Sequence, residues 1–568
     1  MKKSFLTLSL GALLLCSCAG QKEQYYTKHV EFPANATLED KLDMASRLVP
    51  SPQQLAWQQL ELTAFLHFGI NTFTNREWGN GQEDPALFNP VDLDAEQWVR
   101  SLKEAGFKLV ILTAKHHDGF CLWPTKTTQH SVASSPWRDG KGDVVRELRE
   151  ACDKYDMKFG VYLSPWDRNA PCYGDSPAYN QYFVDQLTEL LSNYGEVHEV
   201  WFDGACAEGP NGRKQEYDWD RFYNTIKELQ PKAVMSIMGD DVRWVGNERG
   251  LGRPTEWSAT VLVPSVYGRS EQVNDNLGIK ATSKDLGSRE LVAKATEMFW
   301  YPSEVDVSIR PGWFYHASED ERVKSLEHLV NIYFESVGYN SSLLLNIPPD
   351  TRGLIHDNDV ARLKELAAYI DKTFAKDFVA DSKPWSGAEG TSQEFKLSPA
   401  GLINTVMVQE DIERGQRIES FRVEVLKDGE WVNAGEGTTV GYKRLLRFPQ
   451  TQAEAVRITI LGSRGTANIK KVGAFYAEPI LGSQTELTLG NIDAKAWHAV
   501  GADAATAFDG DASTTWSQPS LDALVIDLGK NETLKGFVYV PTQADDKAGT
   551  PYKYAFSVSD DGKTLDRG

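Results

Sequence analysis

Residues 109–120 read LVILTAKHHDGF. A continuous apolar run ends here in a lysine, two histidines and an aspartate. Unbroken apolar runs of this length are typical of strands in a parallel sheet that is covered on both faces. Similar runs occur at Phe159–Leu163 and Glu199–Phe202, and each is followed by polar or aromatic residues. The pattern predicts a parallel sheet whose functional groups gather at the carboxyl ends of its strands.

The same alternation of strand-like and helical segments extends from about Pro50 to Lys372. The expected strands are Thr63–His67, Leu109–Ala114, Phe159–Leu163, Glu199–Phe202, Ala233–Ile237, Val305–Ile309 and Leu343–Asn346. The expected helices include Asp94–Ala105, Val144–Tyr155, Tyr179–Asn193 and Trp219–Leu229. No glycine-rich dinucleotide turn follows an early strand, which favours a barrel over an open sheet. We predict an α/β fold, a distorted (β/α)8 TIM-like barrel over residues 50–373, followed by all-β sandwich domains.

Beyond Thr373 the pattern changes to short alternating strands. Phe421–Leu426 precede the pair Asp428-Gly429, which is a common hairpin turn, and Val456–Leu461 form a further strand. We predict an all-β sandwich over residues 374–483.

The N-terminus has the features of an export signal. Lys2 and Lys3 precede the apolar run Phe5–Leu15, which is too short to span a bilayer stably. Ser17-Cys18 resembles a bacterial lipobox, in which a small residue precedes a lipidated cysteine. We expect a signal peptide over residues 1–17, lipidation of Cys18 and a tether over 18–49, and thus an exported protein anchored at a bacterial membrane, at its periplasmic or outer surface. Secretion without a lipid is the alternative.

Composition restricts the partners. The apolar fraction of 41% and the charged fraction of 25% are those of a soluble globular chain. A net charge of −20 argues against nucleic acid or an anionic bilayer surface as a partner, so membrane contact is expected only through the lipid. The four cysteines outside the N-terminal segment, Cys121, Cys152, Cys172 and Cys206, lack the spacing of a zinc site. We expect no cofactor.

The strand ends carry the chemistry, because a barrel enzyme builds its site there. Glycoside hydrolysis needs one carboxylate that attacks the sugar or activates water, and one carboxylic acid that protonates the leaving oxygen. Asp203 follows the fourth strand and is the candidate nucleophile; the alternative is that it caps the next helix. Neighbouring histidines can bond sugar hydroxyls, and tryptophan faces can stack on a sugar ring.

His116-His117-Asp118 also suggests a metal site. Adjacent residues on a strand point to opposite sides, so both histidines are not expected to share one ion. We therefore predict hydroxyl recognition and no metal.

Together the strand ends resemble those of the α-L-fucosidases of glycoside hydrolase family 29, over about residues 50–370. The matching pieces are His67-Phe68-Gly69, Glu77-Trp78, His116-His117-Asp118-Gly119-Phe120, Tyr162 and Trp201-Phe202-Asp203-Gly204. The resemblance implies a retaining exo-α-L-fucosidase in which Asp203 forms a covalent fucosyl-enzyme. It also implies a fucose pocket formed by His67, Glu77, Trp78, His116, His117, Tyr162, Trp201, Arg243 and Trp313.

Two glutamates compete for the role of general acid and base. Glu248, in Arg243-Trp244-Val245-Gly246-Asn247-Glu248, matches the subgroup of the family that prefers α1,3/1,4-fucosyl linkages in Lewis-type glycans. Glu256, in Thr255-Glu256-Trp257, lies nearer the place where the broader-specificity subgroup has its carboxylate. We prefer Glu248, with a fucosylated oligosaccharide or glycoconjugate as the substrate. Whichever acts must be protonated near neutral pH.

The last region begins near Gln484. Ala507–Trp516 and Leu524–Gly529 resemble segments of the discoidin-like (coagulation factor type C) carbohydrate-binding fold. Residues 484–568 are fewer than that jelly roll usually has, so we expect an incomplete module. A non-catalytic lipoprotein that captures glycans through its β modules is the remaining alternative for the whole chain.

Overall fold

The computed structural model describes residues 24–379 and 381–480, together with short segments of the C-terminal region, namely 497–500, 504–509, 514–517, 523–530, 539–540, 557–559 and 566–567. The predicted signal peptide and Cys18 lie outside the described residues. The chain divides into two compact units, Met1–Glu478 and Pro479–Gly568. In the part of the chain that is described, no helix has both the length and the apolar character that a bilayer crossing requires.

An eight-stranded parallel sheet forms the centre of the first unit. Its strands are β2 (Leu62–Leu66), β3 (Leu109–Lys115), β4 (Lys158–Leu163), β5 (Glu199–Phe202), β6 (Val234–Ile237), β7 (Arg243–Trp244), β10 (Ser303–Ser308) and β11 (Ser342–Asn346). They pair in the order β6-β5-β4-β3-β2-β11-β10-β7. A parallel bridge between Ser236 and Val242 joins the two outer strands, so the sheet closes into a barrel. The predicted fold class is confirmed.

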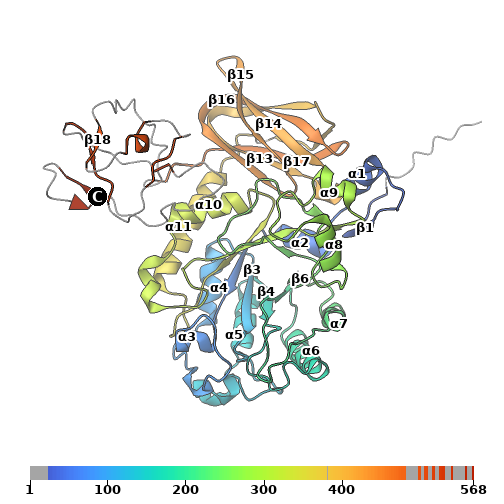
Figure 1. Ribbon diagram of the computed structural model, residues 1–568, viewed down its shortest axis with the longest axis vertical. Helices are drawn as coiled ribbons and strands as arrows, with labels where there is room; N and C mark the ends of the chain where they lie inside the picture. Colours follow the sequence, from blue (N-terminus) through green and yellow to red (C-terminus); the bar gives the residue numbers. More distant parts are fainter. Residues whose placement is uncertain are drawn as a thin grey trace, which may run out of the picture. The chain divides into compact units, whose positions relative to one another are not determined.

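Helices with acidic caps follow the early strands. They are α4 (Ala95–Glu104), α5 (Val144–Lys154), α6 (Ser176–Asn193) and α7 (Trp219–Leu229), and Figure 1 shows them in succession around the strands. The side chains of Asp94, Asp143 and Asp218 accept backbone N–H bonds at the starts of α4, α5 and α7, which satisfies groups that a helix leaves unpaired. Two further helices, α10 (Leu326–Ser336) and α11 (Asp357–Phe374), flank β11 in sequence.

The barrel is distorted between β6 and β10. Residues 238–241 connect β6 to β7 by bends, where a regular barrel would have a helix. Between β7 and β10 the chain forms an additional layer that the sequence did not predict. This layer contains α8 (Ser270–Leu277), α9 (Arg289–Lys294), β8 (Ala259–Thr260) and β9 (Glu297–Trp300). The N-terminal strand β1 (His29–Glu31) joins it, and the three strands form an antiparallel sheet in the order β1-β9-β8. The short helices α1 (Leu38–Ser46), α2 (Pro52–Gln58) and α3 (Ile70–Thr74) complete the barrel region.

Carboxyl groups lie inside the barrel beside the apolar residues. Glu199 accepts a hydrogen bond from Trp57 Nε1 at 2.9 Å, and Glu304 accepts one from Trp201 Nε1 at 2.8 Å. Both glutamates are fully buried, and burial raises the pKa of each carboxyl, with the neighbouring charge of Glu199 raising that of Glu304 further. The two groups therefore hold protons at pH values where an exposed glutamate is ionised.

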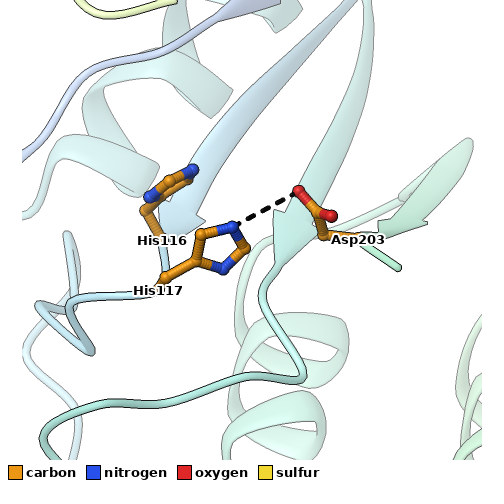
Figure 2. A group of neighbouring side chains, drawn as sticks. All are labelled: His116, His117 and Asp203. Carbon is orange, nitrogen blue, oxygen red and sulfur yellow. Dashed lines mark ion pairs between the residues drawn. The ribbon is translucent and has the colours of Figure 1, made fainter. Parts of the chain in front are cut away.

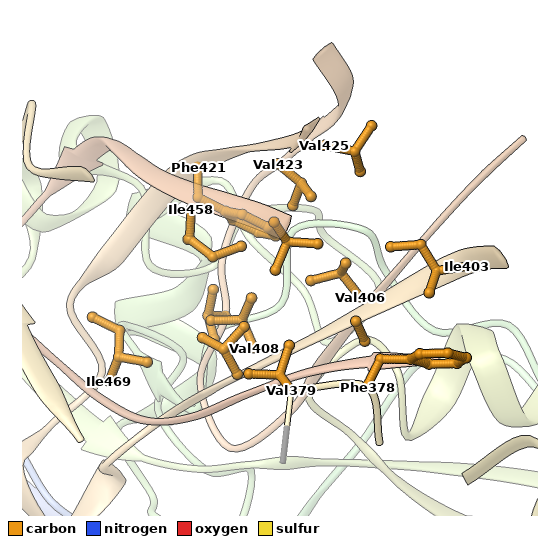
Figure 3. Packing of buried hydrophobic residues seen from close by; sticks show 14 of the residues in the cluster. Phe378, Val379, Ile403, Val406, Val408, Phe421, Val423, Val425, Ile458 and Ile469 are labelled. Carbon is orange, nitrogen blue, oxygen red and sulfur yellow. The ribbon is translucent and has the colours of Figure 1, made fainter. Parts of the chain in front are cut away.

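The second part of the first unit is a six-stranded antiparallel sheet. Its strands pair in the order β12 (Trp385–Gly387), β17 (Ala467–Phe475), β13 (Ser392–Glu410), β16 (Arg444–Ser463), β14 (Ile418–Lys427) and β15 (Glu430–Gly437). The register of β13 on β16 shifts at two places, and such irregularities let long strands bend around a core. Figure 3 shows that core, with Val406, Phe421 and Ile458 packed together. β13 and β16 are longer than the short strands we predicted.

The predicted hairpin between β14 and β15 is confirmed. Asp428 and Gly429 form its two-residue turn, with φ of 53° and 81°. Positive φ at both positions is the geometry that the right-handed twist of the flanking strands requires.

The second unit is described only in short segments. β18 (His498–Ala499) pairs with β19 (Ile526–Asp527), and β20 (Ser557–Val558) pairs with β21 (Asp566–Arg567).

Candidate active site

The predicted residues of β2, β3, β4 and β5 meet at one end of the barrel. His67 follows β2, His116 and His117 follow β3, and Asp203 follows β5. Figure 2 shows the His117 ring directed at Asp203, with Nε2 3.6 Å from Asp203 Oδ2. Since consecutive parallel strands end at the same edge of the sheet, these four positions were expected to converge.

One step of the metal argument was wrong. The rings of His116 and His117 do not point to opposite sides: their centroids lie 4.1 Å apart. The strand β3 ends at Lys115, so the alternation of a strand does not apply to the two histidines. One potential ligand atom from each of His116, His117 and Asp203 lies within 4.8 Å of the others. These three side chains lie close enough together to bind one metal ion. The predicted absence of a metal therefore stays a prediction.

The Asp203 carboxylate is held on two sides and open on a third. Tyr162 donates its hydroxyl proton to Oδ2 at 3.0 Å, and the Ala205 N–H donates to Oδ1 at 2.8 Å. The side chain keeps 26% exposure, so a substrate can reach it. Burial raises the pKa of Asp203 above its ordinary value, although these two hydrogen bonds to the charged form act in the opposite direction.

The three histidines of the site are neutral at physiological pH. Burial lowers the pKa of His67 and of His117 to about 3, and lowers that of His116 well below its usual range. A neutral imidazole can donate one hydrogen bond and accept another, which suits sugar hydroxyls. His116 Nδ1 is buried and has no hydrogen-bond partner among the described residues.

Aromatic rings form the walls. Tyr162 stacks on Trp201 with centroids 5.3 Å apart and on His116 at 5.6 Å. The Trp313 ring lies 5.0 Å from His67. Trp78 contacts His117 edge to face at 5.4 Å, yet it remains 55% exposed. A large apolar side chain with that exposure, at the rim of a polar site, offers a flat face to a sugar.

Glu77 ties the loop after β2 to the loop after β10. It accepts hydrogen bonds from the backbone N–H groups of Trp313 at 2.8 Å and Phe314 at 3.2 Å, and it bonds His316 Nε2 at 2.7 Å. Asn346, at the end of β11, adds a second tie, because its amide donates to Trp313 O at 2.8 Å while its oxygen lies 2.8 Å from His67 Nδ1. The Trp313 backbone is thus held from the loop after β2 and from the end of β11.

Glu248 reaches the same rim from the loop after β7. Its side chain is exposed, and Trp313 Nε1 donates to its Oε2 at 3.3 Å. Trp313 therefore lies between His67, in the pocket, and Glu248, at its edge.

A further carboxyl, Asp306 on β10, was missed by the sequence reasoning. It is buried and accepts a hydrogen bond from Trp244 Nε1 at 2.9 Å. Burial raises its pKa to about 8, opposed by the Trp244 bond and reinforced by the negative charges of Glu248 and Asp203. An aspartate within the apolar strand Val305–Ile309 was the signal that could have indicated it.

Two further residues considered for the site, Arg243 and Glu256, are buried in a common ion cluster. Glu256 is only 2% exposed, and its carboxylate forms ion pairs with Arg243 and Arg253. Arg243 is equally buried, and its guanidinium donates to Tyr301 O at 2.9 Å and Trp257 O at 3.1 Å. Arg243 Nη1 is buried and has no hydrogen-bond partner among the described residues, so the predicted place of Arg243 in the fucose pocket stays a prediction. The ion pairs leave Glu256 without the access that a general acid needs.

Comparison with known proteins identifies relatives along most of the chain. The family described as "Alpha-L-fucosidase" matches residues 56–373, and the family described as "F5/8 type C domain" matches residues 491–566. The Arabidopsis thaliana protein named Alpha-L-fucosidase 1 is 41% identical over 479 residues, which cover 78% of this chain and 90% of that protein.

Solved structures agree with these matches. A crystal structure of a Bacteroides ovatus protein shares 63% identity with a TM-score of 0.81, covering 96% of this chain and 91% of that one. A Ruminococcus gnavus glycoside hydrolase family 29 fucosidase, solved in complex with fucose, shares 31% identity with a TM-score of 0.67 and covers 78% of this chain and 97% of that one.

Proposed function

Since this chain belongs to the α-L-fucosidase family, glycoside hydrolase family 29, we propose that it is a retaining exo-enzyme that releases terminal α1,3/1,4-linked L-fucose from Lewis-type glycans. The observation that carries the proposal is the environment of Asp203. Its carboxylate is bonded by Tyr162 and Ala205, is open to solvent on one side, and faces neutral histidines. Membership of a hydrolase family sets aside the alternative of a non-catalytic glycan-binding protein.

The mechanism has two displacements at the anomeric carbon. In the first, an Asp203 oxygen attacks C1 of fucose while Glu248 gives its proton to the departing glycosidic oxygen, so that a fucosyl-enzyme ester forms and the glycan leaves. In the second, Glu248 takes a proton from a water molecule, the water oxygen attacks C1, and the ester bond to Asp203 breaks. Two inversions return the sugar with its original α configuration.

The pocket residues have separable roles in this scheme. The neutral rings of His67, His116 and His117 bind fucose hydroxyls, because each can donate and accept without placing a cation beside Asp203. Tyr162 keeps its hydrogen bond to Asp203 and thereby favours the ionised nucleophile. The faces of Trp201 and Trp313 provide the apolar wall for the ring and its methyl group.

We prefer Glu248 to Glu256 as the general acid and base because a substrate can reach its carboxyl group. It is exposed beside Trp313, whereas Glu256 is buried between two guanidinium groups. This contrast supports the subgroup that prefers α1,3/1,4 linkages over the broad-specificity alternative with Glu256 as the acid. The exposed face of Trp78 at the rim suits a glycan that carries a second sugar beside the fucose.

The decisive assay follows the first sugar released. The protein is incubated with a Lewis-type α1,4-fucosyl trisaccharide, with a matched α1,2-fucosyl trisaccharide as the control, and the anomers are recorded by NMR before mutarotation. We expect α-L-fucose from the first substrate and much slower release from the second. Initial release of β-L-fucose contradicts retention, and equal rates on both substrates contradict the linkage preference.

We also propose export and lipid anchoring through Cys18, on the basis of the lipobox-like Ser17-Cys18. Metabolic labelling with a fatty-acid analogue tests it. The full chain becomes labelled and sediments with membranes, and Cys18→Ser loses the label; a labelled Cys18→Ser protein rejects the proposal.

A further inference from the structure

The loop that carries Glu248 is stiffened by its own residues. Gly246 and Gly250 have φ of 99° and 76°, in the left-handed region that favours glycine. A side chain at either position would also press against Thr282 or Ile332. The Asn247 side chain accepts the Arg249 N–H at 3.0 Å and donates to Leu251 O at 2.8 Å. Glu248 therefore lies within a closed turn.

The base of the same loop is tied together by a buried charge cluster. Glu256 pairs with Arg243, which belongs to β7, and with Arg253 at 3.1 Å. Arg253 also donates to the carbonyl oxygen of Val245, which directly follows β7. The start of the loop, at 243–245, is thus joined to its end, at 253–256, and the turn with Glu248 lies between them.

The β-sandwich holds this base from the other side. Thr439 Oγ1 accepts the N–H of Glu256 at 2.8 Å, and Gln416 Nε2 donates to Glu256 O at 3.1 Å. Thr438 donates its hydroxyl proton to Pro254 O at 2.7 Å. Residues before β14 and after β15 therefore bind the backbone of a loop whose tip is at the active site.

A buried ion cluster of this kind adds little net stability compared with apolar packing, because burying the charges costs nearly as much as pairing them returns. Its directional bonds instead define one geometry for the loop. A general acid needs such definition, since a small displacement from the leaving oxygen costs rate steeply.

We propose that Glu256 is a positioning residue for Glu248, and that the β-sandwich, through Thr439 and Gln416, is a structural part of the acid/base machinery. The inference rests on the proposed role of Glu248 as the general acid and base. Asp203 follows β5 and has no part in this cluster, so attack on the sugar is preserved when the cluster is weakened.

The test uses substrates that differ in their need for an acid. A fucosyl oligosaccharide has a poor leaving group and needs the proton from Glu248. An aryl fucoside such as 2-chloro-4-nitrophenyl fucoside leaves readily without it. Values of kcat/KM are measured for both substrates, and kcat for the aryl fucoside is measured with and without azide, on Glu256→Gln and Thr439→Val. Glu424→Gln is the matched control, because it weakens an ion pair with Arg457 that lies within the β-sandwich, between β14 and β16.

We expect kcat/KM on the oligosaccharide to fall about 10-fold or more in Glu256→Gln and Thr439→Val, with less than about a 3-fold loss on the aryl fucoside. Azide accelerates turnover of the aryl fucoside by these variants, because it replaces the water that Glu248 must activate. Glu424→Gln changes kcat/KM on both substrates by less than about 2-fold. Thr439→Val decides the matter if Glu256→Gln does not fold.

Proportional losses on both substrates, or unchanged rates on both, overturn the inference. The variant Glu248→Ala distinguishes a failure of this inference from a failure of the proposed function. If Glu248→Ala shows the leaving-group difference and azide rescue while the two cluster variants do not, the positioning role alone is rejected. If Glu248→Ala itself lacks them, its role as acid and base is rejected, and the positioning role is rejected with it.

Discussion

At the scale of single residues, the sequence indicated Asp203 as the candidate nucleophile but did not indicate its environment. Asp203 was indicated by its place after an apolar strand, which is a local property of the sequence. Its bond to Tyr162 joins residues from two strands, and its raised pKa depends on burial by the whole rim. Asp306 was missed for the same reason. Its position within an apolar run does not reveal which charged groups will lie near it in the folded protein.

The bond from Tyr162 makes a prediction about pH. Asp203 must be ionised to attack, so kcat/KM rises with pH through its raised pKa. Tyr162→Phe removes a hydrogen bond that favours the charged form, and the acidic limb should move upward by about 1 pH unit. The pH profile on an aryl fucoside measures the shift. Tyr223→Phe, which loses a bond to Met238 O, is the control. An acidic limb that stays in place contradicts the assigned bond.

At the scale of elements, the strands and helices with strong local patterns were predicted closely, and the additional layer was not. β5 and α7 have the predicted bounds. β1 and β9 have only three and four residues, too few to show a clear pattern, and they lie about 270 residues apart. Nothing in the sequence around either strand therefore indicated that the two would pair. β7 has only two residues, too few for an alternating hydrophobic pattern to be recognised in the sequence.

The end of β11 provides the element-scale prediction. Asn346 joins three strand ends, through His67, Ser308 Oγ at 2.9 Å and Trp313 O. Asn346→Ala leaves buried partners unpaired, and we expect about 1–3 kcal/mol lower stability together with weaker fucose binding. Chemical denaturation and calorimetric titration with fucose measure the two effects. Asn358→Ala, which loses one surface bond to Asp320 O, is the control. Unchanged fucose affinity in Asn346→Ala would show that Asn346 does not organise the pocket.

At the scale of the whole molecule, composition and the spacing of apolar residues predicted a barrel followed by a β-sandwich. They did not predict the hydrogen bonds that join the two. The sandwich contacts at Glu256 join residues about 180 positions apart, and the sequence presented Glu256 only as a rival acid. The carboxyls inside the barrel were also unforeseen, because Glu199 lies at the start of a strand, where an exposed position is the ordinary expectation.

These interior carboxyls make stability depend on pH. Folding raises the pKa of Glu199, Glu304 and Asp306 by burial, so the folded state holds protons that the unfolded chain has released. The stabilisation is complete below the ordinary carboxyl pKa and is lost as pH rises through the raised values, up to about 8 for Asp306. Melting temperature should therefore fall between pH 5 and 8 as these groups lose their protons. Glu304→Gln should make that decline shallower, whereas Glu454→Gln at the surface should not. An equally steep decline in Glu304→Gln contradicts the assignment.

The central claim is that Asp203 becomes covalently attached to fucose. A slow substrate such as 2-deoxy-2-fluoro-fucosyl fluoride traps the ester, and mass spectrometry of the digested protein locates it. The account predicts one fucosyl adduct, on the peptide that contains Asp203, and its absence from Asp203→Asn. An adduct on another carboxylate, or full inactivation without any adduct, would contradict it.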